Sequence, residues 1–197
     1  MSGVTSTLLG RPLWYELMTT DTKAAEAFYG TVVGWSTTPF QGAGQPYTMF
    51  NRASDAPVAG VMMRPPDVQA PPFWAMYVGV PKIEDAAAQI QRLGGRAHTP
   101  IIEIPGVGRL QMMADPQGAV FYVYEPASAD QAPEADAEVG DASWRELMTT
   151  DAPAAMTFYG ELFGWQPGET MDMGPAGLYH LFTRPHGMIG GMMNKPP

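Results

Sequence analysis

The sequence predicts an α+β protein built from repeated βαβββ units, which pair to form curved mixed sheets around a cup with the helices on the outside. The strongest observation is a repeated phrase: WYELMTTD at residues 14–21 returns as WRELMTTD at residues 144–151. The match continues at the same offset, because FYGTVVGW at residues 28–35 corresponds to FYGELFGW at residues 158–165. A repeat of this kind indicates duplication of a structural unit.

Two breaks divide the chain into three units. Residues 127–141 carry five acidic side chains and no basic or aromatic one, so they cannot bury apolar surface and form an acidic linker. Residues 65–72 are a shorter break, rich in proline. The units span residues 11–66, 72–126 and 142–197, of which the first two complete one module over residues 1–126 and the third is half of a second module.

Each unit opens with a strand-like run, at residues 13–19, 73–80 and 144–149. The first run is followed by a helix. Asp21 is placed to cap that helix, and an apolar stripe with a spacing of four residues includes Phe28.

The second and third units repeat this order. Their helical stripes run through residues 83–93 and 154–162, and glycine follows each helix as a natural stop. Further strand candidates come after each helix, for example at residues 47–51 and 120–124. A single unit of about 55 residues has a helix on one face of a small sheet, so its other face needs a partner.

Composition excludes several classes of function. The chain has no cysteine, which rules out disulfides, thiolate metal sites and cysteine nucleophiles. Its formal net charge of −9 argues against a nucleic-acid partner, because binding to phosphates needs a surplus of Lys and Arg. No stretch approaches the roughly 20 apolar residues of a membrane span, and residues 1–11 lack a signal-peptide core. We therefore expect a cytoplasmic protein with no membrane or nucleic-acid partner.

Three features occur together in the order of a known family: the paired βαβββ units, the helix that ends in FYG and is followed by GW, and Asp115-Pro116-Gln117-Gly118 before a final strand. In these features the chain resembles the vicinal oxygen chelate superfamily, which includes glyoxalase I, bleomycin- and fosfomycin-resistance proteins and extradiol dioxygenases. The resemblance covers nearly the whole chain outside the linker and is nearest to tandem glyoxalase-like proteins, in which four units make two modules. It implies a cup whose chemistry, where present, uses a divalent metal held by His, Gln or Glu.

The residues at the family's ligand positions predict that the usual metal site is missing. These positions lie on the first and last strands of a unit and correspond to Trp14, Ala75 and Tyr122. Trp and Ala cannot ligate a metal, and Tyr is an uncommon ligand. The three histidines show no pair at a helical or hairpin metal spacing. We therefore expect no cofactor, and a divalent metal is not favoured.

Glu16 is the first candidate catalytic residue. It follows Trp14 by two residues, so it shares a strand face with it. One interpretation places its carboxylate inside the cup as a general base or as a partner for a ligand donor, because apolar surroundings would raise its pKa. The alternative is that it hydrogen-bonds a side chain of a neighbouring strand and only positions it. Glu146 holds the same place in the repeated phrase and is the second candidate.

A further group of residues is predicted to form the wall of the cup. Fifteen methionines, many in strand candidates, favour either a soft gap-filling core or an adaptable cup for a flat apolar ligand. In the second interpretation the cup also has aromatic walls. Its candidate ligand-binding residues are Trp14, Met18, Tyr47, Met49, Trp74, Tyr77, Met113 and Tyr122. Because side chains alternate across a strand, only about half of such residues can face the cup.

The third unit predicts an assembly. It has no partner unit within residues 142–197, which leaves one apolar face of its sheet exposed. Either residues beyond position 197 supply the partner unit, or the third unit pairs with the same unit of a second chain. If the chain ends at residue 197, we expect a homodimer.

The sequence leaves three functions open. The leading one is a metal-independent small-molecule-binding protein that binds or sequesters an apolar or aromatic metabolite, a step that rests on analogy of fold. The second is a metal-dependent lyase, isomerase or dioxygenase with displaced ligands around Glu16. The third is an assembly scaffold without a ligand, which a cup filled by its own Met and Tyr side chains would favour.

Overall fold

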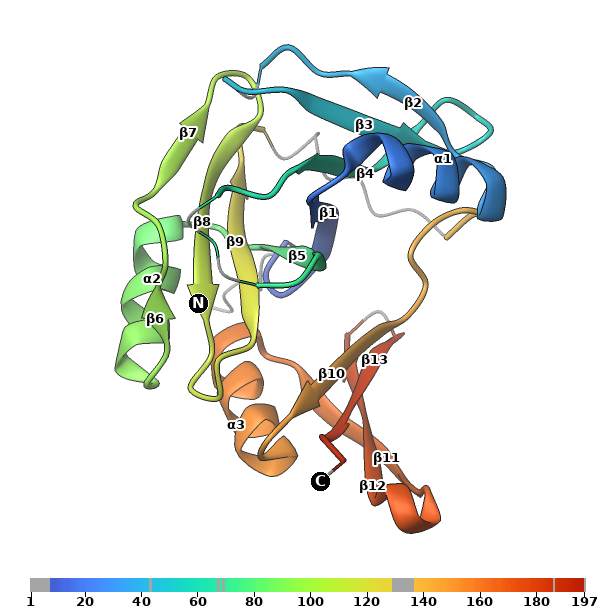
Figure 1. Cartoon of the computed structure of the whole chain (residues 1–197). Coiled ribbons are helices and arrows are strands. Elements are labelled where there is room, and N and C mark those ends of the chain that lie inside the picture. Colours follow the sequence, from blue (N-terminus) through green and yellow to red (C-terminus); the bar gives the residue numbers. More distant parts are fainter. Residues whose placement is uncertain are drawn as a thin grey trace.

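A computed structural model describes residues 8–42, 44–66, 68, 70–128, 137–185 and 187–196. It has the predicted α+β fold, with curved mixed sheets and helices on the outside (Figure 1). The first unit contains β1 (Pro12–Thr19), α1 (Thr22–Val32), β2 (Ser36–Pro39), β3 (Tyr47–Asn51) and β4 (Pro57–Met63). The second contains β5 (Phe73–Gly79), α2 (Ile83–Arg92), β6 (Arg96–Ala97), β7 (Ile102–Ile104), β8 (Gly108–Ala114) and β9 (Val120–Pro126). The third contains β10 (Arg145–Thr149), α3 (Ala152–Phe163), β11 (Gln166–Asp172), η2 (Gly174–Ala176), β12 (Leu178–Arg184) and β13 (Gly187–Asn194).

The first two units share one curved sheet. Its main strand order is β2-β3-β4-β1-β5-β9-β8-β6, and β7 also pairs with β8. The two units meet where β1 and β5 run antiparallel, with Trp14 opposite Tyr77 and Glu16 opposite Ala75. Within each unit the first and last strands are parallel, so β1 pairs with β4 and β5 pairs with β9. The first strand after α2 is split into β6 and β7 around Pro100, which has no N–H to donate to a strand ladder.

The helices begin where the sequence predicts. Asp21 caps α1 by accepting a hydrogen bond from the N–H of Ala24 at 2.9 Å, and Asp151 caps α3 by accepting one from Ala154 at 3.0 Å. The α3 helix ends at Gly164, which adopts the left-handed conformation with φ of 72°. The repeated phrase therefore encodes the same turn from strand to helix twice.

The third unit forms a separate four-stranded sheet in the order β10-β13-β12-β11, which lies below the first module in Figure 1. Its helix α3 packs against the second unit, and apolar side chains from both, including Phe158 and Ile90, form one core. The last part of the linker, residues 137–141, contacts the first unit, because Arg52 forms ion pairs with Glu138 at 3.1 Å and Asp141 at 2.6 Å. Residues 129–136 of the expected linker lie outside the described residues.

Among the residues that the structure describes, no helix is both long enough and apolar enough to cross a bilayer.

Candidate ligand-binding site

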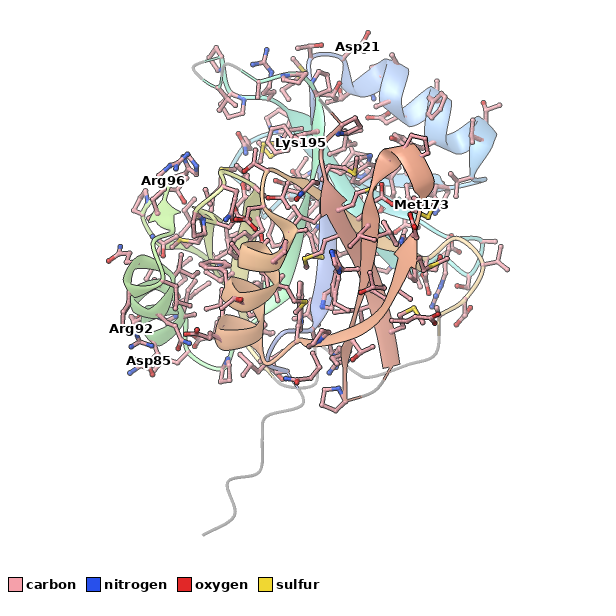
Figure 2. All side chains as sticks on the ribbon, turned by 90° about the horizontal axis from the view of Figure 1, so that it is seen from below. Asp21, Asp85, Arg92, Arg96, Met173 and Lys195 are labelled. Carbon is pink, nitrogen blue, oxygen red and sulfur yellow. The ribbon has the colours of Figure 1, made fainter. Side chains whose placement is uncertain are left out.

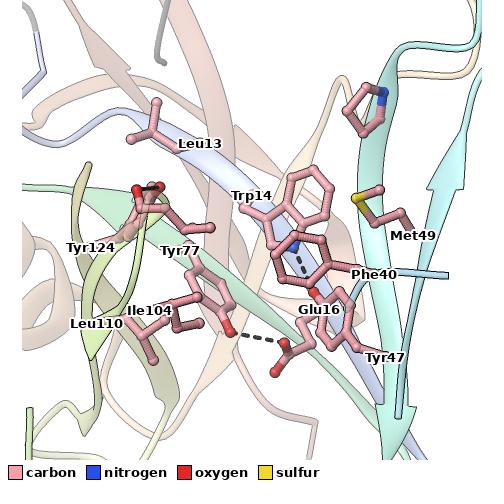
Figure 3. A pocket seen from close by; sticks show the side chains of 12 residues that line it. Leu13, Trp14, Glu16, Phe40, Tyr47, Met49, Tyr77, Ile104, Leu110 and Tyr124 are labelled. Atoms are coloured by element: carbon pink, nitrogen blue, oxygen red, sulfur yellow. Dashed lines mark hydrogen bonds between the residues drawn. The ribbon is translucent and has the colours of Figure 1, made fainter. Parts of the chain in front are cut away.

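The cup formed by the first two units contains a cavity of about 310 Å³ (Figure 3). Its walls come from strands β1, β3, β4, β5, β7, β8 and β9 and from the loops that carry Phe40 and Val107. The side chains that line it are almost all apolar or aromatic: Leu13, Trp14, Glu16, Phe40, Tyr47, Met49, Pro57, Tyr77, Ile104, Val107, Leu110 and Tyr124. A volume near 300 Å³ lies at the small end of the range for small-molecule sites.

The carboxyl group of Glu16 accepts a hydrogen bond inside the cavity, next to a second bond between two wall residues. The hydroxyl of Tyr77 donates to Glu16 Oε2 at 2.9 Å, and the indole N–H of Trp14 donates to the hydroxyl oxygen of Tyr47 at 2.9 Å (Figure 3). Glu16 is only 4% exposed, and its other oxygen, Oε1, is buried without a hydrogen-bond partner among the described residues. A buried polar atom of this kind is costly unless something satisfies it. Glu16 Oε1 is therefore the polar point of an otherwise apolar cavity.

Burial also changes the acidity of this carboxyl group. Removal from water raises the pKa of Glu16 to about 7, because the charged form loses its hydration. The nearby hydroxyls of Tyr77 and Tyr47 act in the opposite direction, but more weakly. Both protonation states of Glu16 are therefore populated at neutral pH, so the side chain can either donate or accept a proton.

The structure brings together most of the residues predicted to form the cup. Trp14, Tyr47, Met49 and Tyr77 line the cavity with Glu16. Two others, Met18 and Tyr122, are buried in the apolar cluster that also contains Trp14, Tyr47 and Tyr77. Tyr122 stacks on Tyr77 with ring centroids 4.2 Å apart, so it supports the ring whose hydroxyl binds Glu16.

Two predicted wall residues do not face the cavity. Trp74 lies on the side of the sheet that faces α1, where its indole N–H donates to the hydroxyl of Tyr29 at 2.9 Å. Met113 is fully buried on the helix side, in the core that contains Ile90. The reason is the alternation of side chains along a strand: Tyr77 faces the cup from β5, so Trp74, three residues earlier, faces away. The expectation that these two residues line the cup is wrong.

Other lining residues were missed by the sequence prediction. Tyr124 and Leu110 lie on strands that were recognised, at positions two residues from Tyr122 and Met112, so alternation could have identified them. Phe40 lies between β2 and β3 in an irregular segment, where no periodic pattern marks it.

Glu146 lies beside the same kind of Trp–Tyr pair as Glu16, but its hydrogen-bond partner and its surroundings differ. The indole N–H of Trp144 donates to the hydroxyl of Tyr179 at 2.7 Å, and that hydroxyl donates to Glu146 Oε2 at 3.1 Å. Glu146 is exposed, because no second unit covers this face of the third unit within the described residues. The structure therefore does not bring the two glutamates into one site.

The residues of the cup do not fit the divalent metal of the resembled family. Glu16 is the only carboxylate among the cavity's lining residues, and no histidine is among them. Within the described ranges no group of three or more His, Cys, Asp or Glu side chains is arranged to hold a metal ion. His180 contacts Thr170 in the third unit, and His186 lies outside the described residues.

Comparison with known proteins agrees with this architecture. No family profile matches the chain. The chain is 29% identical over 191 residues to a putative glyoxylase, CFP32, of Mycobacterium bovis, a match that covers 95% of this chain and 72% of that protein. It is 28% identical over 193 residues to the anthracycline biosynthesis protein DauV of Streptomyces sp. strain C5, covering 89% of this chain and 69% of that protein.

A solved structure shows the same fold at low sequence identity. The 2,2',3-trihydroxybiphenyl 1,2-dioxygenase of Sphingomonas wittichii superposes with a TM-score of 0.65 and 10% identity. The superposition covers 95% of this chain and 70% of the dioxygenase chain. At this identity the likeness concerns the fold alone.

Proposed function

Because the chain has the fold of the vicinal oxygen chelate superfamily, we propose that its first module binds a small, largely apolar or aromatic metabolite in the cavity around Glu16. One observation carries the proposal: an open cavity with apolar and aromatic walls contains a single unpartnered polar atom, Glu16 Oε1. Ligand sites commonly combine such walls with a few placed polar groups. The scaffold alternative is less favoured, since the protein's own Met and Tyr side chains leave the cavity open.

The polar atom constrains the chemistry of the ligand. When Glu16 is neutral it donates a hydrogen bond, which suits a carbonyl oxygen on the ligand. Tyr77 donates its hydroxyl to Glu16 and Tyr124 donates to the carbonyl of Val107 at 2.9 Å, whereas the Tyr47 hydroxyl accepts from Trp14 and lies near Glu16. The similarity to an anthracycline biosynthesis protein supports an aromatic ligand.

We propose that this binding needs no metal. A divalent ion would require several oxygen or nitrogen ligands, and the cavity supplies one carboxylate. The alternative function, a metal-dependent lyase, isomerase or dioxygenase, is therefore less favoured, because the residues around Glu16 supply too few metal-ligand atoms. The cavity instead offers the carboxyl group of Glu16, which gains or loses its proton near neutral pH.

A second function, proton transfer on the bound ligand, is favoured by the acidity of Glu16. A carboxyl with a pKa of about 7 is suited to remove a proton from a carbon beside a carbonyl group and to return it elsewhere on the same molecule. Such an isomerisation is redox-neutral and consumes no co-reactant. Exchange of ligand protons for deuterium, followed by NMR, distinguishes catalysis from sequestration.

The binding proposal is tested with a panel of naphthols, naphthoquinones and anthraquinones. Binding to the native state raises the melting temperature by mass action, and titration calorimetry then measures stoichiometry. We expect one ligand per chain, and we expect Leu110→Trp, which fills the cavity, to abolish binding. Glu146→Gln, at the exposed position of the repeat, is the matched control and should bind as the wild type does.

Two results would contradict the proposal. The first is unchanged affinity in Leu110→Trp, because the ligand would then lie elsewhere. The second concerns the metal: a tightly held divalent ion, detected by elemental analysis and lost in Glu16→Ala, would replace metal-free binding with metal-dependent chemistry.

A further inference from the structure

The hydroxyl group of Tyr47 is a second polar group of the cavity, and its proton is directed toward Glu16. The indole N–H of Trp14 donates to the Tyr47 oxygen at 2.9 Å, so this oxygen already has a donor. Burial raises the pKa of Glu16, and hydrogen bonds from the hydroxyls of Tyr77 and Tyr47 lower it. The Tyr47 hydroxyl therefore acts as an acceptor toward Trp14 and as a donor toward Glu16.

Strand register brings Tyr47 and Glu16 together. Glu16 on β1 lies opposite Gly60 on the parallel strand β4. The hydroxyl of Tyr47 lies directly over Gly60, since a Cβ atom at that glycine would overlap it. The Tyr47 side chain thus reaches across β4 from β3 and brings its hydroxyl beside the carboxyl of Glu16 (Figure 3). Both groups line the same cavity.

The repeat in the third unit shows the direction of this chain of hydrogen bonds. Trp144 donates to the hydroxyl of Tyr179 at 2.7 Å, and that hydroxyl donates to Glu146 Oε2 at 3.1 Å. These residues belong to the strands of the third unit, which lie on the near side of the molecule in Figure 2. In both units the tryptophan thus donates to the tyrosine, and in the third unit the tyrosine donates to the glutamate.

Tyr77 determines which oxygen of Glu16 carries the proton when the carboxyl is neutral. Its hydroxyl donates to Oε2 at 2.9 Å, which favours Oε2 as the carbonyl oxygen. The proton therefore lies on Oε1, which is buried and has no hydrogen-bond partner among the described residues. Neutral Glu16 thus presents an O–H donor beside the O–H donor of Tyr47.

Two adjacent donors in an apolar cavity suit an oxygen that carries negative charge. Such donors stabilise an oxyanion more strongly in a site that excludes water than they do in water. A tyrosine hydroxyl paired with a protonated carboxylic acid is an effective arrangement of this kind. The surrounding wall is aromatic and apolar, which suits the flat ring that carries the oxygen.

We propose that Tyr47 and Glu16 together hold the ionised oxygen of an acidic phenol or enol, so that the ligand class of the cavity is a flat aromatic compound whose hydroxyl group is conjugated with a carbonyl. This ligand class rests on the function proposed for the cavity. Where a neutral ligand meets ionised Glu16, the hydroxyl proton of the ligand moves to Glu16 Oε1. No bond to carbon is made or broken, and no electron is transferred.

The charges around Glu16 make this binding depend on its proton. The titratable side chains that face it are Tyr47 from β3, Tyr77 from β5 and Tyr122 from β9. Glu16 is the only acidic residue among those that line the cavity, and no basic residue lines it. An ionised ligand therefore meets repulsion when Glu16 is charged and two donors when Glu16 is neutral.

The test uses 2-hydroxy-1,4-naphthoquinone, whose acidic enol is conjugated with a carbonyl and is ionised at pH 6 and above. Its methyl ether and unsubstituted 1,4-naphthoquinone carry the same ring without an ionisable oxygen. Titration calorimetry on the full chain at pH 6 measures the three affinities. We expect the hydroxyquinone to bind roughly 10- to 100-fold more tightly than either neutral quinone, because hydrogen bonds to a charged oxygen are the stronger ones. The bound hydroxyquinone should keep the visible absorption of its anion.

The dependence of affinity on pH identifies the proton on Glu16. The hydroxyquinone stays ionised from pH 6 to pH 9, whereas Glu16, with a pKa of about 7, loses its proton. We therefore expect the wild type to lose affinity by roughly 100-fold across this range. In Glu16→Gln the amide oxygen accepts from Tyr77 and the amide N–H groups face the ligand, so its affinity should change by less than about threefold.

Tyr47→Phe isolates the second donor. We expect it to reduce the preference for the hydroxyquinone over the methyl ether by roughly tenfold, because one hydrogen bond to the charged oxygen is lost. Tyr179→Phe, at the repeat counterpart outside the cavity, is the matched control and should keep the preference of the wild type. Circular dichroism establishes that Tyr47→Phe is folded, and the measurements on Glu16→Gln do not depend on that variant.

Several results would overturn the assignment. Equal binding of the three quinones at pH 6 would do so, while the function proposed for the cavity would stand. Loss of the anion's visible absorption on binding, an affinity of the wild type that persists to pH 9, or an unchanged preference in Tyr47→Phe would show that these two groups do not hold an ionised oxygen. Binding of none of the quinones would contradict the function proposed for the cavity, and this ligand class with it.

Discussion

The indole nitrogen of Trp165 donates a hydrogen bond to the carbonyl oxygen of Gly10 at 2.7 Å, although 155 residues separate them in the chain. Gly10 adopts a φ of 72°, and a Cβ atom there would lie 2.6 Å from the carbonyl oxygen of Phe163. Glycine is thus required both by the backbone conformation and by the close approach. The contact fixes the segment before β1 against the third unit.

Trp165→Phe is expected to lower the free energy of unfolding by about 2 to 4 kcal/mol, because it removes a buried hydrogen bond and part of a packed ring. Trp165 stacks on Phe182 with centroids 4.9 Å apart, so the loss includes core contacts. Urea unfolding followed by circular dichroism measures the change. Trp35→Phe, at the reciprocal but half-buried position, is the control and should cost less. If both variants lost the same free energy of unfolding, the burial of Trp165 could not be what determines its contribution to stability.

Glu16→Gln is expected to change how stability depends on pH. The folded pKa of Glu16 is about 7, above its ordinary value of 4.5. Between these values the folded protein keeps a proton that the unfolded chain releases, so stability contributed by protonated Glu16 is complete below pH 4.5 and is lost as the pH rises through 7. The shift corresponds to about 3 kcal/mol. The free energy of unfolding of Glu16→Gln should therefore rise relative to the wild type by about this amount between pH 4 and pH 8.

Urea titrations of both proteins at these two pH values isolate the contribution of Glu16, because all other titrating groups are common to them. Gln keeps an oxygen that can accept from Tyr77, so the packing of the cavity is preserved. Glu146→Gln provides the matched control at the exposed copy of the phrase. A pH-independent difference between the wild type and Glu16→Gln would refute the raised pKa of Glu16.

Much of the fold could be predicted from local patterns. The helix caps at Asp21 and Asp151, the three βαβββ units and the position of Glu16 in the cup all follow from residue order and from alternation along a strand. Alternation shows which residues share a face of the sheet, but one reference residue is needed to decide which face is inside the cup. Once Tyr77 is known to face the cup, the rule that places Glu16 there also places Trp74 and Met113 on the opposite face.

The rest depends on contacts between units, which the repeats do not reveal. The helices α1 and α3 have nearly the same apolar stripe, yet Phe158 is buried in the core that contains Ile90 of the second unit, whereas Phe28 is 56% exposed. Phe40 and Ile104 reach the cavity from opposite units of the module. No pattern within one segment can identify such neighbours.

Gly60→Ala is expected to destabilise the protein by about 1 to 3 kcal/mol and to weaken ligand binding, because overpacking displaces Tyr47. A Cβ atom at Gly60 would overlap the hydroxyl and ring of Tyr47, which lines the cavity and accepts a hydrogen bond from Trp14. Backbone strain is not the cause, since Gly60 is outside the left-handed region. Urea unfolding and calorimetry measure the two effects.

The matched variant is Gly191→Ala, whose Cβ atom would overlap Tyr179 in the third unit. Tyr179 lies on the open face of its sheet and can turn toward solvent, so we expect a loss below about 1 kcal/mol and no effect on ligand affinity. A larger loss at Gly191 than at Gly60 would contradict the argument that Trp14 and the other wall residues confine Tyr47.

Tyr159→Phe is expected to lower the free energy of unfolding by about 1.5 to 3 kcal/mol, because it leaves a buried carboxylate oxygen without its donor. The hydroxyl of Tyr159 donates to Asp115 Oδ2 at 3.0 Å, and Asp115 is fully buried. Urea unfolding measures the loss, and amide exchange in α3 should rise because this contact joins the third unit to the second. Tyr29→Phe is the control: its hydroxyl accepts from Trp74 at an exposed site, so its effect should stay within about 0.5 kcal/mol. If Tyr159→Phe were equally mild, the Asp115 contact could not be what holds α3 against the second unit.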